Sequence, residues 1–370
     1  MTENITTRQI EAAKLLEGAL RGDRMDQLKV KEGISTSDFP VQIQPYLNRI
    51  LLENYAAIPK VWDAFATKTV LDDFRPQKYF QFKFDQDNIP AENGGNAFID
   101  GSLPNVGEYD EYPTLSFSAT EQEISVKKSG ERIRFSWESI INDNNFGVIE
   151  RLPMELAMHA AGLEDREATK QLVSGSGLNT TNFNSTNQNI GTSGNGAGVN
   201  PALSIDSLQK AMNAVNQQTY NGRPITPVQS WTLVVSPALE MTARNILSVT
   251  ELRTTVGNDL QIHGNPVAGR VNVVVNHWLT RINANAGAYW FLIPAPSTSL
   301  NPSVVLSFLR GHETPELRVK SEGGLLLSGG EVPVRAGSFD NDDFQMRIRH
   351  LATGGFLVPA GTFASTGAGA

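Results

Sequence analysis

The stretch that decides the fold of this chain runs from Phe80 to Glu123, where the sequence reads FQFKFDQDNIPAENGGNAFIDGSLPNVGEYDEYPTLSFSATEQE. At its start aromatic residues alternate with polar ones, and near its end Leu115, Phe117 and Ala119 alternate with hydroxyl side chains. Alternation with a period of two residues is typical of strands that have one covered face. Glycines and prolines break any regular element in between. The stretch therefore predicts a long two-stranded ribbon with an irregular tip.

The same stretch holds the whole acidic excess of the protein. The chain has 370 residues and a formal net charge of −8, and from Asp85 to Glu123 there are nine acidic residues and no basic residue. They are Asp85, Asp87, Glu92, Asp100, Glu108, Asp110, Glu111, Glu121 and Glu123. One interpretation is a solvated acidic loop. The other is an arm that lies on a second copy of the chain, and we expect this one, because a two-stranded ribbon is marginal alone and so long a loop usually has a function.

Two other segments supply a basic counterpart to the ribbon. Residues 131–137 and 345–350 each alternate apolar side chains with arginines, which predicts strands with an apolar inner face and an arginine outer face. An ordinary solvated strand surface is the alternative, whereas opposite charges would steer and orient a partner. We expect contacts between copies to join the acidic residues Asp85, Asp87, Glu92, Asp100, Glu108, Asp110 and Glu111 to the arginines Arg132, Arg134, Arg347 and Arg349.

The N-terminal half also predicts helices. A mixed-charge helix is expected over residues 7–20 and a second from Leu47 to Tyr55, with the breaker-rich residues 33–45 extended between them. The strongest helical pattern runs from Phe146 to Val173, follows the capping candidates 143–145 and would be about 42 Å long.

Of the 27 residues at 174–200, 21 are Gly, Ser, Thr or Asn and none is charged, so we expect a flexible loop without a core.

A compact α/β pattern fills the stretch from Leu203 to Pro296. Ser204 or Asp206 is placed to cap a helix, and Ser236 and Pro237 open another. Strands are expected at residues 231–235, 271–275 and 288–293, and the pattern from Ser303 onward is again that of strands.

Composition excludes several classes of protein. No run of eighteen apolar residues exists, which excludes a membrane span, and the first twenty residues lack the apolar centre of a secretory signal. The chain has no cysteine, so disulfides and thiolate metal sites are excluded as well. A net negative charge argues against a protein whose main surface binds nucleic acid.

Motifs for catalysis are missing. The sequence has no P-loop and no Gly-x-Ser-x-Gly elbow, and its glycines at 194, 196 and 198 have the wrong spacing for a dinucleotide site. The five histidines show no metal-ligand spacing. Glu164, Asp165 and Glu167 are expected to be solvated helix carboxylates and not an acid/base pair. We predict no catalytic, cofactor or metal site.

Eight short segments in a fixed order carry a family resemblance. They are DFRP at 73–76, RIRF at 132–135, IINDN at 140–144, RLP at 151–153, LEDRE at 163–167, GSG at 175–177, NGRP at 221–224 and LVVSPALE at 233–240. In this order they resemble the major capsid proteins of tailed bacteriophages, which share the Hong Kong 97-type fold, and most closely the Mu-like head-protein branch.

The resemblance implies an α+β protein with a Hong Kong 97-like capsid fold. Its parts would be an N-terminal arm, an extended β-hairpin loop, a peripheral domain with a long spine helix, and an α/β axial domain. On this sequence the expected boundaries are arm and docking helix 1–55, start of the peripheral domain 56–74, extended loop 75–126, peripheral domain with spine helix 127–174, flexible loop 175–202, axial domain 203–302, peripheral strands 303–352, and C-terminal return to the axial domain with tail 353–370.

The resemblance implies a structural protein and no enzyme. Copies would assemble as pentamers and hexamers into an icosahedral shell that encloses double-stranded DNA, after assembly in the bacterial host cytoplasm. Further implied partners are a portal, a separate scaffolding protein and a decoration protein, with no membrane and no cofactor. A cellular encapsulin-like nanocompartment that encloses cargo enzymes is the alternative with the same fold. A soluble hydrolase that uses Ser176 or the helix carboxylates is a remote third.

Two features depart from parts of that family. Some members weld neighbours by a Lys–Asn isopeptide bond with the lysine in the extended loop, but here only Lys78 and Lys83, on the incoming arm, are available. We therefore predict no covalent cross-link, because the amine nucleophile is missing at the tip. No long charged helical stretch precedes the arm to act as a built-in scaffold, which is why a separate scaffolding protein is expected.

Overall fold

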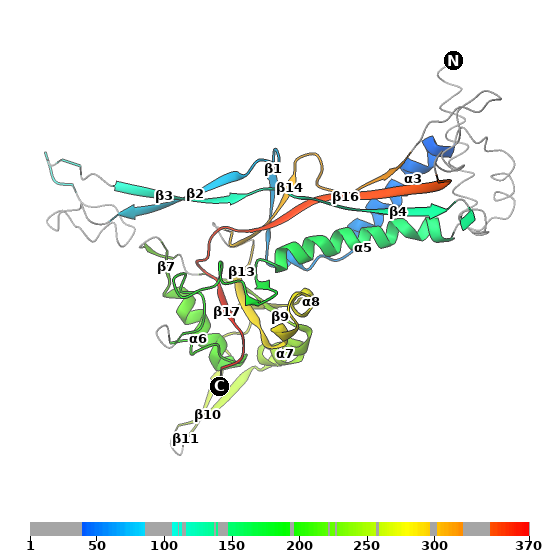
Figure 1. The fold of residues 1–370 in the computed structure, drawn as a ribbon. Helices are drawn as coiled ribbons and strands as arrows, with labels where there is room; N and C mark the ends of the chain where they lie inside the picture. Colours follow the sequence, from blue (N-terminus) through cyan, green and yellow to red (C-terminus); the bar gives the residue numbers. More distant parts are fainter. Residues whose placement is uncertain are drawn as a thin grey trace, which may run out of the picture. The chain divides into compact units, whose positions relative to one another are not determined.

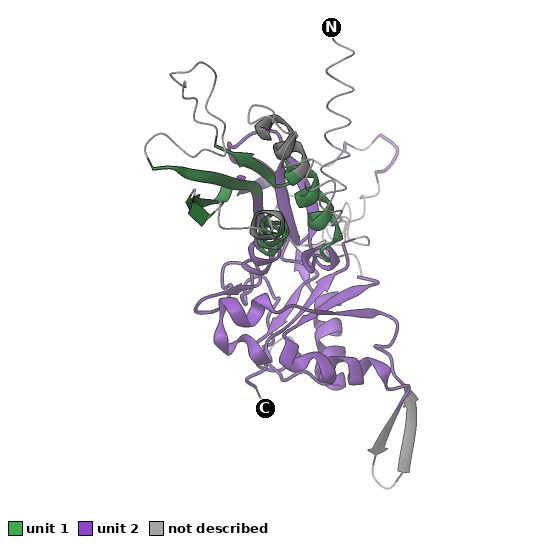
Figure 2. Ribbon diagram, turned by 90° about the vertical axis from the view of Figure 1, so that its right-hand side faces the viewer, with its two compact units in different colours: residues 1–59, 128–162, 312–351 green, residues 60–127, 163–311, 352–370 purple. Residues whose placement is uncertain are grey.

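The computed structural model divides the chain into two compact units, each assembled from separated stretches of sequence (Figure 2). The first unit takes residues 1–59, 128–162 and 312–351, and the second takes 60–127, 163–311 and 352–370. The structure describes residues 39–85, 106–109, 111–112, 116–136, 138–139, 147–192, 196–220, 223–225, 228–256, 259–296, 302–320 and 341–369. The expected helix at 7–20 lies outside these residues.

The first unit is built on a three-stranded antiparallel sheet. Residues 343–351 of β16 (Asp343–Phe356) form the central strand between β4 (Lys128–Ser136) and β15 (Glu316–Val319). The inner face of the sheet packs with α3 (Phe39–Ala57) and the first part of α5 (Gly147–Thr169) around Leu51, Leu156 and Ile348. Burying one such leucine stabilises the unit by about 2 kcal/mol. The apolar face predicted from the alternating pattern is therefore the face that holds the helices.

The second unit carries the predicted ribbon. β2 (Gln77–Asp85) and β3 (Ser116–Ile124) are antiparallel, with Gln77 opposite Ile124 and Asp85 opposite Ser116 (Figure 1). Among the described strands, β2 and β3 pair only with each other. The ribbon is thus a two-stranded element, as its period-two pattern predicted.

The strands next to the ribbon form a second sheet in this unit. After the 3-10 turn η1 (Trp62–Ala64), β1 (Thr67–Leu71) lies parallel to β14 (Val304–Leu309), which is antiparallel to residues 352–356 of β16. Their core side chains include Phe65, Leu306 and Phe308.

A four-stranded mixed sheet forms the centre of the α/β part. Its order is β12 (Val271–Val275), β9 (Trp231–Val235), β13 (Trp290–Pro294) and β17 (Phe363–Ser365). Every residue of β9 and β13 is buried, which explains why both strands are mainly apolar.

Helices cover both faces of this sheet. One face packs on Leu208 of α6 (Ile205–Asn216) and Ile246 of α7 (Glu240–Ser248), and the other on Leu279 of α8 (Trp278–Ile282). Two 3-10 turns, η4 (Pro237–Leu239) and η5 (Ala284–Ala288), complete this part.

The two predicted helix caps have different outcomes. Of the two cap candidates Ser204 and Asp206, Ser204 caps α6, and it does so through a capping box with Ser207. Ser236 makes no side-chain cap before η4, and its hydroxyl instead donates to the Gly287 carbonyl at 2.5 Å.

The prediction of a coreless flexible loop at 174–200 is wrong for the residues that the structure describes. Phe183 is buried and its ring centroid lies 5.6 Å from that of Phe291. Asn189 is fully buried, and its amide donates to the Asn182 carbonyl at 2.9 Å and to the Thr362 hydroxyl at 3.1 Å. Asparagine side chains satisfy the backbone here, so a mostly polar segment with little regular structure packs on a hydrophobic core.

Two helix boundaries also differ from the prediction. α3 begins at Phe39, inside the stretch predicted to be extended, because a proline at its second residue is compatible with a first helical turn. α5 ends at Thr169 and not at Val173, which forms the small hairpin β5 (Val173–Ser174) and β6 (Gly177–Leu178).

Two further hairpins are β7 (Thr219–Tyr220) with β8 (Arg223–Pro224), and β10 (Glu251–Val256) with β11 (Asp259–Gly264).

Within the described residues, no helix is long and apolar enough to cross a membrane. The predicted α+β class, with an extended ribbon, a long helix and an α/β part, is confirmed.

Candidate functional site

The acidic segment predicted to contact a second copy is described in part. Glu108 and Glu111 are exposed, and between and beside them Tyr109 and Tyr112 are 99% and 82% exposed. Asp85 ends β2, although its side chain is not among those described. The predicted contact residues outside the described part are Asp87, Glu92, Asp100 and Asp110.

The ribbon itself keeps an apolar side chain in solvent. Phe80 lies opposite Glu121 and is 55% exposed, although the alternating pattern assigns it to the covered face. On the same strand Lys78 donates to Glu121 at 2.5 Å. The covered face predicted for β2 is therefore open in a single protomer, at least at Phe80.

The four predicted arginines all lie on the sheet of the first unit, but two of them are paired within the protomer. The Arg134 guanidinium lies 2.6 Å from Asp343, and that of Arg349 lies 2.5 Å from Glu316. Arg132 and Arg347 are exposed and have no ion-pair partner among the described residues.

The strand register brings a further arginine to the two unpaired ones. Arg347 lies opposite Arg132 on β4 and opposite Arg318 on β15, so the three occupy one level of the sheet. Neighbouring strands lie about 4.8 Å apart, and like charges directly opposite each other are destabilising. We call Arg132, Arg347 and Arg318 the arginine row. Sequence reasoning missed Arg318, although its alternation with Leu317 and Val319 is a strand signal.

Glu316 offsets part of this positive charge. Its carboxylate accepts from Arg349, from Arg318 at 3.2 Å and from His312. Burial tends to raise the pKa of Glu316, but the hydrogen bonds and charges of His312 and Arg349 outweigh it and hold the pKa below the ordinary value. The row therefore keeps a net positive charge beside a firmly ionised carboxylate.

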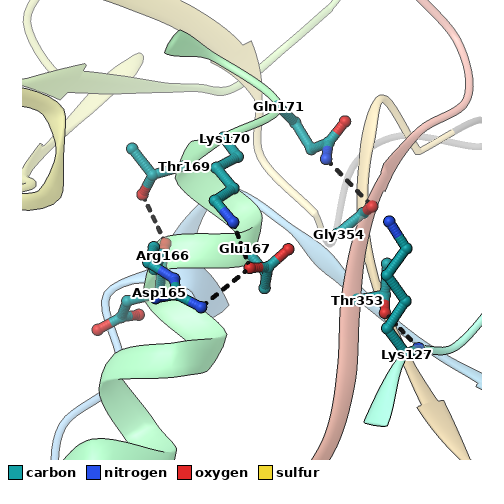
Figure 3. A network of polar contacts seen from close by, with 9 residues as sticks. All are labelled: Lys127, Asp165, Arg166, Glu167, Thr169, Lys170, Gln171, Thr353 and Gly354. Carbon is teal, nitrogen blue, oxygen red and sulfur yellow. Dashed lines mark hydrogen bonds and ion pairs between the residues drawn. The ribbon is translucent and has the colours of Figure 1, made fainter. Parts of the chain in front are cut away.

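The C-terminal end of α5 forms a polar network in the second unit (Figure 3). Glu167 accepts from Lys170 at 2.7 Å and from Arg166 at 3.4 Å, and Asp165 points to the opposite side of the helix. The Gln171 amide donates to the carbonyl of Gly354 on β16 at 3.1 Å.

The prediction of solvated carboxylates is wrong for two of the three acidic residues on this helix. Glu164 is fully buried and Asp165 is 6% exposed, while Glu167 is partly exposed. Trp62 donates to both buried carboxylates, from its indole Nε1 to Glu164 at 2.8 Å and from its backbone N–H to Asp165 at 2.9 Å. Their burial follows from packing against a segment about 100 residues away, which no local pattern indicates.

Among the described residues, no three His, Asp or Glu side chains gather in a way that could hold a metal ion. His159 lies 3.0 Å from Glu131, and His350 is buried with its ring edge-on to Tyr55.

Comparison with known proteins gives one sequence match. A family model described as phage capsid protein matches residues 119–365, about two thirds of the chain. No curated protein matches the sequence.

Solved structures with a similar fold include the asymmetric unit of the bacteriophage PhiM1 mature capsid, which is 11% identical, covers 83% of this chain and 86% of its own, and has a TM-score of 0.45. A Microbacterium phage Oxtober96 structure is 11% identical, covers 82% and 90%, and has a TM-score of 0.44. The holo-SrpI encapsulin complex from Synechococcus elongatus is 9% identical, covers 81% and 85%, and has a TM-score of 0.43. At these identities and TM-scores the solved structures add nothing to what the family model shows.

Proposed function

The chain belongs to the phage capsid protein family, and from that premise we propose that it is the major capsid protein of a tailed bacteriophage, whose copies form pentamers and hexamers in an icosahedral shell around double-stranded DNA. A capsid protein is a structural component of the virion and not an enzyme. The family match over residues 119–365 carries this proposal. A ribbon with an exposed Phe80 supports it, because such an element gains stability when another copy covers it.

The test is the size and content of the particles that the full chain forms. Expressed with a scaffolding protein, the chain is expected to yield hollow particles of megadalton mass in negative-stain microscopy and size-exclusion chromatography. A monomer or dimer as the final state contradicts the proposal. Particles that enclose a protein cargo in place of DNA would support the nanocompartment alternative.

The other partners are proposals of the same kind. We propose assembly in the host cytoplasm on a separate scaffolding protein, with a portal and a decoration protein as further components. Shells of uniform and correct size from this chain alone would contradict the need for a scaffold.

We further propose how neighbouring copies are held. The acidic segment of one copy, with Glu108 and Glu111 flanking the exposed Tyr109, docks on the arginine row of another. Carboxylates pair with guanidinium groups, and tyrosine rings stack on them. Arg134 and Arg349 contribute less than the sequence predicted, because Asp343 and Glu316 already neutralise them.

Charge reversal tests this contact. R132E/R347E should abolish shell formation while the far-UV circular dichroism of the unassembled chain is retained, and adding E108R/E111R should restore part of it. K210E on α6 reverses an exposed charge of the same sign as a control. Normal shells from R132E/R347E would show that the ribbon does not dock on the row. Normal shells with a lower content of DNA would instead assign the row to phosphate groups.

A further inference from the structure

The two buried carboxylates at the end of α5 have no task in shell building as proposed above. Glu164 and Asp165 are adjacent in sequence, and both side chains are removed from solvent. Burying one carboxylate is costly unless it is paired and hydrogen-bonded, and burying two neighbours adds their mutual repulsion. An arrangement of this cost needs a physical account.

Both carboxylates hold one short segment, the turn at residues 60–65 that opens the second unit. Trp62 donates to each of them, and the Lys60 ammonium lies 3.3 Å from the Glu164 carboxylate. Trp62 and Phe65 in turn belong to the core of the unit, and the Trp62 ring centroid lies 6.0 Å from that of Phe308. The carboxylates therefore fasten the turn to α5 at the edge of a hydrophobic core.

The charges around Asp165 do not balance. Glu164 and Lys60 are the charged groups that act on its carboxyl, so one ammonium faces two acids. Asp63 of the turn is exposed, and Arg166 and Glu167 of α5 are partly exposed and form ion pairs among themselves and with Lys170. Thr169 of α5 and Asn276, which follows β12, are uncharged. Burial raises the pKa of Asp165 to about 6, although the backbone N–H groups of Trp62 and Val61 act in the opposite direction.

We propose that Glu164 and Asp165 form a proton-operated latch, in which a proton on the pair strengthens the attachment of residues 60–65 to α5 and its release loosens that attachment. When the turn opens, the Asp165 carboxyl enters water and regains its ordinary pKa of 3.8. The closed state then binds a proton more tightly than the open one between about pH 4 and pH 6. Opening therefore becomes easier as the pH rises through that window, and it stays easier above it. This latch goes beyond the proposed function and does not depend on it.

Amide hydrogen exchange of the full chain tests the latch. The peptide that spans residues 60–66 is followed by mass spectrometry at pH 5 and pH 8, after correction for the intrinsic exchange rates, in unassembled chain and in shells. The two pKa values give protection about tenfold lower at pH 8 than at pH 5. D63N removes an exposed carboxyl from the same turn and should behave as the wild type.

Two variants of the latch complete the test. D165N should lose the pH effect on this peptide, because its amide does not titrate. E164Q should move the midpoint to lower pH, because the repulsive charge beside Asp165 is removed while an acceptor for the Trp62 indole remains. Equal protection of the wild type at both pH values overturns the latch, as does a pH effect that survives in D165N. If D165N fails to fold, an unchanged midpoint in E164Q overturns it.

Discussion

At the scale of single residues, Glu316 shows how the arginine face is kept from repelling itself. Arg349, Arg318 and His312 donate to its carboxylate, and the net effect is a pKa below the ordinary value of 4.5. A carboxyl whose pKa is lower in the folded state contributes stability above its unfolded pKa and loses it as the pH falls through the folded value. Glu316 thus stabilises the first unit at neutral pH and not in strong acid.

We expect E316Q to lower the free energy of unfolding by about 1 kcal/mol at pH 7, since the carboxylate is partly solvated. The difference from the wild type should shrink as the pH falls below the ordinary pKa of 4.5, because the wild-type carboxyl is then progressively protonated. Urea unfolding at pH 7 and at successively lower pH values measures it. E53Q, which breaks an exposed pair with Arg49 in the same unit, serves as the control and should cost only a few tenths of a kcal/mol. A larger loss in E53Q than in E316Q would contradict this account.

Gly354 is a second residue whose role lies in packing. A Cβ at this position would lie 2.1 Å from the carbonyl oxygen of Glu167, so β16 approaches α5 closely only because the side chain is missing. G354A should destabilise the chain by about 2 to 3 kcal/mol, within the range for overpacking. Thermal unfolding compares it with G175A, where a Cβ meets nothing within 4 Å. Equal melting temperatures for the two variants would show that β16 moves away at little cost.

Residue-level prediction from the sequence succeeded where the environment is local. Ser204 caps α6 because its partner lies three residues away. The burial of Asp165 and Asn189 was not predictable in this way, because their hydrogen-bond partners Trp62 and Thr362 are more than 100 residues distant. A polar residue that is buried by a distant segment leaves no periodic signal.

At the scale of elements, the ribbon and the arginine strands were predictable because a period of two residues is a strong signal. Arg318 and the pairing of Arg349 with Glu316 were not, because a strand's register against its neighbours depends on the whole sheet. The prediction of a coreless loop at residues 174–200 failed for a related reason. The composition of this segment excludes an apolar core of its own, but it does not exclude packing on the core of another element.

The ribbon makes a prediction about where its energy resides. F80S should leave the thermal stability of the unassembled chain within about 0.5 kcal/mol of the wild type, because Phe80 is largely solvated in a single protomer. It should lower the yield of shells, since a side chain that is exposed alone gains burial only against another copy. F65A is the contrast. Loss of this buried ring should lower the free energy of unfolding by about 3 to 5 kcal/mol and so prevent folding. Sedimentation and circular dichroism on both variants separate assembly from folding. A normal shell yield from F80S would mean that the open face of β2 stays open in the shell.

At the scale of the whole molecule, the proposed shell raises the question whether its subunits are covalently cross-linked or held by non-covalent contacts alone. Many weak contacts per subunit can close a stable cage, so a covalent bond is not required. The loop tip has no lysine, and Lys78 on the incoming strand is held by Glu121, whose hydrogen bond raises the pKa of the amine. A more firmly protonated amine is a poorer nucleophile.

We therefore expect mature shells, boiled in detergent, to run on a denaturing gel as one band at the mass of a single chain. The chain has no cysteine, so disulfides cannot produce a ladder, and any higher band would report another covalent bond between subunits. K78R and K83R identify the source if a ladder is seen, because arginine keeps the charge but does not form the isopeptide bond. A ladder that disappears in either variant would show that the incoming arm, and not the tip, carries a reactive amine. If it disappears in K78R, the ion pair between Lys78 and Glu121 opens in the shell.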